Sequence, residues 1–191
     1  MFGFFGLEGH AFLAFISIII ALAGWEWARL AGFATQLQRV IYAAVTVAAL
    51  LLLNNNDALL MPTLYVAGAF WLLAIAMVLS FPASIACWGG RLGKLLIGLV
   101  IIVPAGLGLQ VLKTLPQGNT LILSLMLLVW GADIGAYFFG RALGKRKLAP
   151  RVSPGKSWAG LFGGLLTSVC IAAGLAVCLQ VPASELVLLL L

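Results

Sequence analysis

Six long apolar stretches constrain the fold of this chain more than any other feature. They run over Ala11–Trp27, Val40–Leu53, Leu59–Phe81, Leu95–Leu112, Thr120–Phe139 and Trp158–Leu179. Most of them approach the roughly 20 apolar residues with which a helix crosses the hydrocarbon core of a bilayer. The polar segments between them are short, so no sizeable domain fits outside the membrane. We therefore expect residues 1–191 to form a single all-α membrane domain, a polytopic helical bundle of about six transmembrane helices.

Composition excludes the other classes of fold. The chain is 64% hydrophobic and only 8% charged, whereas a soluble domain carries roughly a quarter charged residues. A soluble domain, a disordered chain and a disulfide-stapled secreted scaffold are all incompatible with these values. Any chemistry must therefore lie in the short loops or inside the helical bundle.

The basic residues predict how the bundle is oriented. Ten of the eleven Lys and Arg residues fall in alternate loops, and Lys113 alone falls on the opposite side. Cytoplasmic loops carry the excess of Lys and Arg in membrane proteins. We therefore expect the loops at 28–39, 82–94 and 140–158 to face the cytoplasm and the N-terminus to lie outside. Because topology accounts for the positive charge, nucleic-acid binding is not expected.

Both ends of the sequence suggest an internal fragment of a longer protein. A truncated seventh apolar stretch begins at Glu185 and runs only to Leu191. A helix of that length rises about 10 Å, about a third of the hydrocarbon core. The first residues carry no feature that would drive their export, so a further helix is expected before Met1.

Asp133 is the acidic residue that lies well inside an apolar stretch. A carboxylate in a membrane helix costs about 2.5 to 3.5 kcal/mol on insertion scales, so it usually faces the bundle interior and has a partner or a task. Small residues flank it, which allows a neighbouring helix or a ligand close to the backbone. Three glycine pairs are expected to serve helix packing, namely Gly89 with Gly93, Gly131 with Gly135, and Gly160 with Gly164.

A basic loop directly follows the stretch that contains Asp133. Six of the eleven basic residues fall between Arg141 and Lys156, among Gly, Pro and hydroxyl residues. This composition suits a shaped phosphate-binding loop. A Walker A motif is excluded, because Pro150 occupies the position of its first glycine. The alternative interpretation is topology alone, with attraction to anionic lipid of about 1 kcal/mol per basic residue.

Together, the carboxylate and the cationic loop are the parts needed to handle phosphate with a divalent cation. They occur in Trp-Gly-Ala-Asp-x-Gly-Ala-Tyr from Trp130, Gly-Lys-x-Lys-Leu-Ala-Pro from Gly144 and Val-Ser-Pro-Gly-Lys-Ser-Trp from Val152. These motifs closely resemble those of the phosphatidate cytidylyltransferase family, also called CDP-diacylglycerol synthases. A weaker likeness covers residues 25–33, so the resemblance extends over most of the chain.

The resemblance implies a reaction, its substrates and its location. The phosphate of phosphatidic acid would attack the α-phosphorus of CTP, giving CDP-diacylglycerol and pyrophosphate, with Mg²⁺ required and a second cation possible. The active site would face the cytoplasm from the inner membrane of a bacterium, amid anionic phospholipid. A homodimer is an expectation from the resemblance alone. The helices of residues 11–112 would precede a catalytic region over 120–191, which includes the basic loop at 140–158.

The resemblance also assigns roles to individual residues. Asp133 would hold the metal and form the catalytic centre together with Lys156. The expected contacts to the phosphates of CTP or of the lipid are Lys145, Lys147, Arg151, Ser153 and Ser157. Attack between two anions needs charge neutralisation and positioning, which a metal ion and basic side chains supply electrostatically.

Two departures and one absence limit these expectations. Ile134 stands where the family usually has a small hydroxyl residue, and Ala159 stands where a polar or acidic side chain is common. The chain also lacks the acidic, Lys-containing signature of the family's C-terminal part, so we expect the polypeptide alone to be inactive. Two alternatives stay open. One is a CTP-dependent polyprenol or phytol kinase, and the other is a transporter or lipid-binding membrane subunit with Asp133 as an ion ligand.

Overall fold

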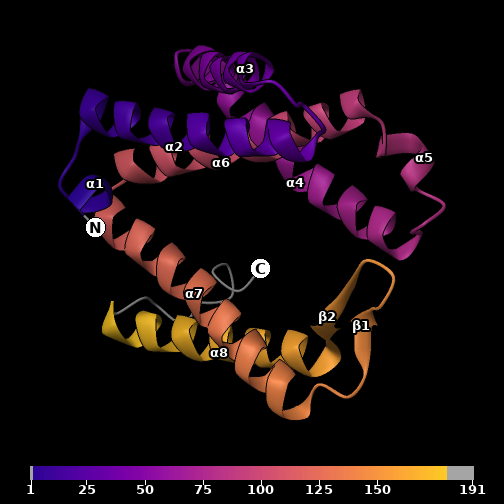
Figure 1. The fold of residues 1–191 in the computed structure, drawn as a ribbon. Coiled ribbons are helices and arrows are strands. Elements are labelled where there is room, and N and C mark those ends of the chain that lie inside the picture. The colour runs from indigo at the N-terminus through magenta and orange to yellow at the C-terminus, as the bar shows by residue number, and fades with distance from the viewer. Residues whose placement is uncertain (1, 180–191) are drawn as a thin grey trace. The chain divides into compact units, whose positions relative to one another are not determined.

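The computed structural model describes residues 2–179, and six long helices dominate them (Figure 1). These are α2 Gly9–Leu30, α3 Gln36–Asn54, α4 Asp57–Leu79, α6 Arg91–Thr114, α7 Gly118–Leu143 and α8 Trp158–Cys178. Each is long and apolar enough to cross a membrane. The predicted all-α polytopic architecture is thereby confirmed, and the chain is an integral membrane protein. The expected seventh segment from Glu185 lies outside the described residues.

The helix α3 is longer than the apolar stretch that predicted it, and its N-terminal cap explains the difference. The apolar stretch begins at Val40, but α3 begins at Gln36 and has 19 residues. The Thr35 hydroxyl accepts a hydrogen bond from the Gln38 backbone N–H at 3.4 Å. Such a cap satisfies one of the amide groups that a helix leaves unpaired at its start. The cap therefore allows α3 to begin with a polar turn that precedes the apolar stretch.

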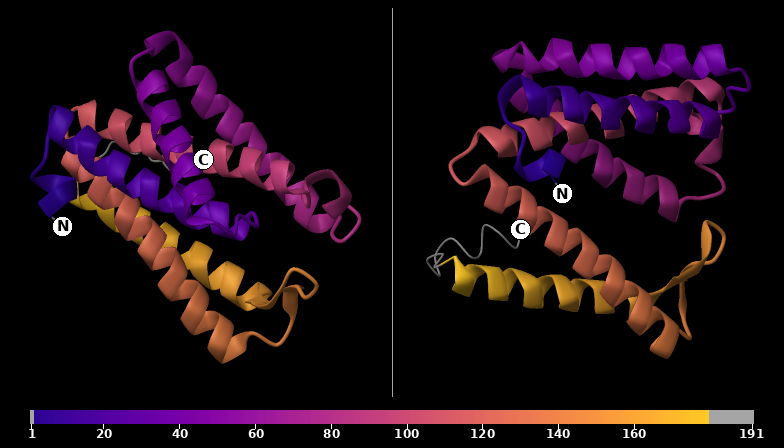
Figure 2. Two further views of the ribbon diagram at one scale, coloured as in Figure 1. Left: turned by 45° about the horizontal axis from the view of Figure 1, so that its top comes forward. Right: turned by 60° about the vertical axis from the view of Figure 1, so that its left-hand side comes forward.

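The structure divides into two compact units, residues 1–119 and 120–191. In the first unit α2, α3 and α6 pack against one another, as both views in Figure 2 show. Large side chains fill the space between these helices, and Phe12, Ile16, Leu50 and Leu107 are fully buried. In contrast, α4 has no buried residue although it contacts α3 and α6. Two one-turn helices, α1 Phe2–Phe5 and α5 Ile85–Trp88, complete this unit.

Hydrogen bonds from two aromatic side chains fasten the first turns of α6. The Trp27 indole N–H donates to the Lys94 carbonyl at 2.7 Å, and the Tyr42 hydroxyl donates to the Leu95 carbonyl at 2.7 Å. Gly98 makes this approach possible, since a Cβ there would lie 2.5 Å from the Tyr42 hydroxyl oxygen. The position requires glycine because of the close approach.

In the second unit α7 and α8 approach each other through glycine. A Cβ added at Gly135 would lie 2.7 Å from the Gly163 carbonyl oxygen, and one at Gly164 would lie 2.9 Å from the Ala132 carbonyl oxygen. A Cβ at Gly131 would overlap the Ile171 side chain, and one at Gly160 would lie 2.9 Å from the Ala136 carbonyl oxygen. The packing role predicted for Gly131 with Gly135 and for Gly160 with Gly164 is confirmed.

The packing role predicted for Gly89 with Gly93 is wrong. A Cβ at Gly89 would lie 2.6 Å from the Ile85 carbonyl oxygen, and one at Gly93 would lie 2.9 Å from the Trp88 carbonyl oxygen. Both neighbours belong to the adjoining short helix α5. These two glycines therefore allow a tight connection between α5 and α6, and they do not mediate contact between long helices.

The basic loop after α7 contains a small β-hairpin that the sequence did not predict. Strand β1, Lys147–Ala149, pairs antiparallel with β2, Ser153–Ser157. The register places Lys147 opposite Ser157 and Ala149 opposite Ser153, with an irregularity between them. The Val152 N–H closes the connecting turn on the Ala149 carbonyl at 3.1 Å. The loop is therefore a defined ribbon that leads directly into α8.

Candidate functional site

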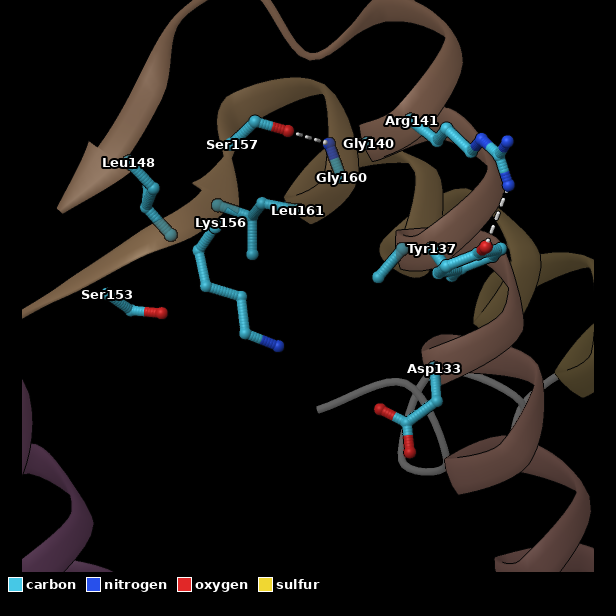
Figure 3. A pocket seen from close by; sticks show the side chains of 12 residues that line it. Asp133, Tyr137, Gly140, Arg141, Leu148, Ser153, Lys156, Ser157, Gly160 and Leu161 are labelled. Carbon is cyan, nitrogen blue, oxygen red and sulfur yellow. Dashed lines mark hydrogen bonds between the residues drawn. The ribbon is translucent and has the colours of Figure 1, made fainter. Parts of the chain in front are cut away.

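A cavity of about 560 Å³ lies where α7, the hairpin and α8 meet (Figure 3). Its walls come entirely from the second unit. The lining residues are Asp133, Ala136, Tyr137, Gly140, Arg141, Leu148, Ser153, Gly155, Lys156, Ser157, Gly160 and Leu161. A volume of this size is typical of sites that bind small molecules.

The helix α7 contributes one continuous face to the cavity. Asp133, Tyr137 and Arg141 are spaced four residues apart, which places them one above the other on the same side of a helix. Figure 3 shows the Asp133 carboxylate extending from α7 into the cavity. The Arg141 guanidinium donates a hydrogen bond to the Tyr137 hydroxyl at 3.0 Å. This face carries a carboxylate and a cation separated by two turns of helix.

The strand β2 contributes Lys156 and two serines from the other side. Figure 3 shows the Lys156 side chain extending from the hairpin on the side of the cavity that faces Asp133, with Ser153 beside it. Within residues 2–179, only Glu26 and Arg29 form an ion pair, defined as a nitrogen and an oxygen within 4.0 Å of each other. Asp133 and Lys156 therefore face a common space without direct pairing, and a ligand between them could contact both.

The first turn of α8 adds a partial positive charge at the cavity wall. Ser157 is the N-cap of α8, and its hydroxyl accepts a hydrogen bond from the Gly160 N–H at 3.1 Å. Only 5% of this serine is exposed. The amide groups at a helix N-terminus attract anions, phosphate groups in particular. Gly144 lets the end of α7 lie against this cap, since a Cβ there would lie 2.7 Å from the Ser157 oxygen.

The donor set determines which metal could bind here. Across residues 2–179, no three His, Cys, Asp or Glu side chains gather into a group that could hold a metal ion. A transition-metal site built from protein ligands alone is therefore not formed by these residues. Mg²⁺ is different, because it is commonly bound by one or two carboxylates and takes its other ligands from substrate phosphates and water. Asp133 fits that mode of binding.

Comparison with known proteins assigns the chain to a family. The model of the "Cytidylyltransferase family" matches residues 1–191. The chain belongs to this family. The sequence-based recognition is confirmed, because curated relatives in the family are themselves named phosphatidate cytidylyltransferase.

Three of these relatives come from bacteria. The protein of Pseudomonas aeruginosa is 52% identical over 163 residues, which are 85% of this chain and 60% of the relative. The protein of Haemophilus influenzae is 44% identical over 111 residues, which are 54% of this chain and 38% of the relative. The protein of Brucella suis is 52% identical over 68 residues, which are 36% of this chain and 24% of the relative. The chain thus spans at most about 60% of the length of these relatives. No solved structure matches it significantly.

Four of the seven site residues expected for a cytidylyltransferase line the cavity. They are Asp133, Ser153, Lys156 and Ser157. The other three, Lys145, Lys147 and Arg151, are exposed and are not part of its wall. Lys145 precedes β1 and Arg151 lies in the turn between the strands, at the two ends of the hairpin. Their contacts with substrate stay a prediction.

Two polar residues of the cavity carried no assigned role in the sequence-based site. Tyr137 and Arg141 both line it and are hydrogen-bonded to each other. The signal that could have found them is their helical spacing from Asp133, four and eight residues along the same face. Leu148 and Leu161 form apolar parts of the wall. The sequence-based site was predicted from charged and hydroxyl residues, which gave no indication of these two leucines.

Proposed function

We propose that this chain forms part of an integral membrane enzyme that transfers the cytidylyl group from CTP to phosphatidic acid, giving CDP-diacylglycerol and pyrophosphate for phospholipid synthesis. The observation that carries the proposal is the cavity that joins Asp133, Lys156, Ser153 and Ser157. It is built from the segment with the family's motifs, at the end of a membrane helix. The names of the curated relatives support the same reaction.

The arrangement of charge in the cavity suits this chemistry. A phosphate oxygen of phosphatidic acid forms a bond to the α-phosphorus of CTP while the bond from that phosphorus to pyrophosphate breaks. Both reactants are anions, so their approach needs positive charge that is already in place. Lys156, Arg141 and the N-terminus of α8 provide it from two sides. The Ser153 and Ser157 hydroxyls would orient phosphate oxygens.

Mg²⁺ is the cofactor we propose, held by Asp133 and by the phosphates of the nucleotide. When bound, it would neutralise charge on the triphosphate. A second cation would need ligands beyond this one carboxylate. Lys145, Lys147 and Arg151 would contact CTP phosphates or the lipid phosphate from outside the cavity wall. Anionic phospholipid in the surrounding membrane would be attracted to the same basic hairpin.

The bacterial inner membrane is the proposed location, with the cavity open to the cytoplasm. Ten of eleven basic residues on one predicted side and the bacterial origin of the relatives support this orientation. A homodimer is proposed on the family resemblance. Crosslinking of the detergent-solubilised chain would test for it.

Binding of CTP tests the proposed nucleotide site directly. The purified chain in detergent micelles should bind CTP in the presence of Mg²⁺ and prefer it to ATP. Asp133→Asn and Lys156→Met should each weaken binding by about tenfold, because each removes a charge that contacts the ligand or its metal. Glu26→Gln and Lys94→Met, which change the same charges in the first unit, should leave it unchanged. Mg²⁺-independent binding, or none, would contradict the proposal.

The position of the label in the lipid product separates the enzymatic alternatives. A cytidylyltransferase places the α-phosphorus of CTP in the lipid, whereas a CTP-dependent polyprenol or phytol kinase places the γ-phosphorus there. The assay therefore uses α-labelled and γ-labelled CTP in parallel, with phosphatidic acid or a polyprenol as acceptor. A chain that is inactive alone incorporates neither label, and nucleotide binding then decides: a cytidylyltransferase chain still prefers CTP, whereas a transporter or lipid-binding subunit shows no preference for cytidine nucleotides. Incorporation of α-label by this chain would overturn the expectation that it is inactive alone.

A further inference from the structure

A second polar site lies in the first unit, where it shares no residue with the Asp133 cavity. Two cavities of about 570 Å³ and 560 Å³ meet at Gly9, Gln110 and Thr114, which line both of them. They are built by the start of α2, the end of α3, the start of α4, the end of α6 and the first residues of α7. In the topology predicted from the basic residues, all of these helix ends lie at the outer surface of the membrane.

Gln110 is the polar group at the junction of the two cavities. Only 9% of this residue is exposed, and among the described residues its side-chain nitrogen has no hydrogen-bond partner. Buried polar groups are nearly always paired, because an unpaired one loses its hydration without compensation. The nitrogen itself is screened from solvent, although the residue lines both cavities. A ligand that supplied an acceptor would compensate this donor once the amide turned toward the cavity.

Lys113 places a fixed positive charge one helical turn from Gln110. Its ammonium donates to the Phe4 carbonyl at 2.9 Å and to the Asn119 side-chain oxygen, and it lies 5.0 Å from the centre of the Phe12 ring. No carboxylate of the described residues lies within 4.0 Å of it. These contacts hold the ammonium at the wall of the first cavity while leaving its charge unneutralised. An ammonium has three N–H donors, so one remains for a ligand.

The N-terminus of α2 adds to the positive charge at the same place. Gly9 adopts a left-handed conformation with φ of +51° as α2 begins, and it lines both cavities. The preceding Glu8 also lines the first cavity and makes no side-chain cap, although its carbonyl accepts bonds from the N–H groups of Ala11 and Phe12. The helix therefore begins beside the cavities without a side-chain cap. Gln110, Lys113 and this helix start supply donors to the joined cavities, and Glu8 supplies one carboxylate to the same wall.

The far wall of the second cavity has the opposite character. Asp57 is exposed in the first turn of α4, and Asn54 and Asn55 lie beside it along the cavity wall. Carboxylate and amide oxygens accept hydrogen bonds from an ammonium group. The joined cavities thus combine an anion-binding end at Lys113 and Gln110 with a cation-binding end at Asp57.

We propose that these joined cavities bind the headgroup of a zwitterionic phospholipid that carries a primary ammonium. Its phosphate accepts from Gln110, Lys113 and the first turn of α2, and its ammonium donates to Asp57. Helix ends at the membrane surface lie at the depth of lipid headgroups, which makes such a lipid the ligand available there. The proposal does not depend on the cytidylyl-transfer reaction, because no residue of the Asp133 cavity takes part.

The test measures binding of short-chain phosphatidylethanolamine to the purified chain in detergent. Lys113→Gln and Gln110→Leu should each weaken binding by about tenfold, since each removes a donor to a charged phosphate. Lys94→Gln, a charge change at the opposite end of α6, is the matched control and should have no effect. Gln110→Leu should also raise the melting temperature without lipid, because it removes a buried unpaired group. Binding that survives Gln110→Leu would overturn the proposal even if Lys113→Gln fails to fold.

Two further probes separate the headgroup from simpler ligands. Asp57→Asn should weaken binding of phosphatidylethanolamine and leave the weaker binding of phosphatidylglycerol, which lacks the ammonium, unchanged. Equal affinity for the two lipids would overturn the assignment of the ammonium end. Inorganic phosphate should not displace phosphatidylethanolamine at equal concentration. Displacement at equal concentration would mean that the cavities bind free anions, and the lipid assignment would be wrong.

Discussion

The two units of the chain pack their helices differently. In the first, large buried side chains such as Phe12, Ile16 and Leu107 fill the space between α2, α3 and α6, and glycines there admit neighbouring side chains. In the second, α7 and α8 meet at glycines so closely that an added Cβ at Gly135 would lie 2.7 Å from the Gly163 carbonyl oxygen. Lipid chains are as apolar as leucine, so both kinds of contact depend mainly on van der Waals packing.

The difference explains where chemistry can occur. Large side chains fill much of the space between helices in the first unit, and its two polar cavities described above lie at helix ends. The glycine contacts involve the backbone of α7 and its Phe139 side chain, whereas Asp133, Tyr137 and Arg141 line the cavity beside α8. Truncation of a buried side chain in the first unit should therefore change stability without changing CTP binding, whereas a substitution at the glycine contact should change both.

Leu107→Ala should have the largest effect on stability. This side chain is fully buried in α6, and truncation of a buried leucine costs about 2 to 5 kcal/mol through lost contacts and the cavity left behind. Unfolding of the chain in mixed micelles would measure the loss. Leu52→Ala, at a side chain that is 72% exposed, is the control and should change stability by less than about 0.5 kcal/mol. CTP affinity of the folded Leu107 variant should be unchanged, and a loss of affinity would break the proposed separation of roles.

Gly135→Ala should cost less stability but should also weaken CTP binding. The added methyl group would overlap the Thr167 hydroxyl and crowd the Gly163 carbonyl, and overpacking of this kind costs about 1 to 3 kcal/mol. Gly174→Ala in α8, where nothing lies within 4 Å of the added Cβ, is the matched control. The control should be neutral or stabilising by about 0.5 to 1 kcal/mol, because alanine favours a helix. If both variants bind CTP equally, the glycine contact does not position the cavity.

Much of the fold was predictable from the sequence because lipid imposes a simple rule. A helix satisfies its backbone internally, so apolar length alone identified all six long helices. The helix ends were less predictable. Thr35 caps α3, which therefore begins four residues before the apolar stretch. The hairpin was missed because β1 has three residues and β2 reads Ser-Pro-Gly-Lys-Ser, without an alternating apolar pattern.

The candidate site was predictable where a residue had a distinguishing environment in the sequence. Asp133 stood out as a carboxylate in an apolar helix, and Lys156 stood out through its motif. Lys145, Lys147 and Arg151 could not be placed, because charge alone does not say which side chains of a hairpin reach a cavity wall. The structure leaves these three outside that wall.

Tyr42→Phe tests how much a single hydrogen bond between helices contributes to the stability of the first unit. The Tyr42 hydroxyl donates to the Leu95 carbonyl at 2.7 Å and joins α3 to α6. Hydrogen bonds between membrane helices contribute on average about 0.6 kcal/mol, so we expect a loss of about that size in the free energy of unfolding. Tyr65→Phe in α4, where the tyrosine is 74% exposed, should have no effect. A loss above about 2 kcal/mol would mean that hydrogen bonds, rather than large side chains, dominate the first unit.

Glu26→Gln should have the smallest effect. Glu26 pairs with Arg29 at 2.8 Å within α2, but the two side chains are 48% and 56% exposed. Exposed ion pairs contribute about 0 to 1 kcal/mol, and salt screens them. We expect a loss of less than about 0.5 kcal/mol in low salt and none that can be measured at high salt. A double-mutant cycle with Arg29→Gln isolates the pair from other effects of either residue. A coupling that persists at high salt would mean that packing alone does not account for the stability of the first unit, and that its surface charges must be counted beside Leu107.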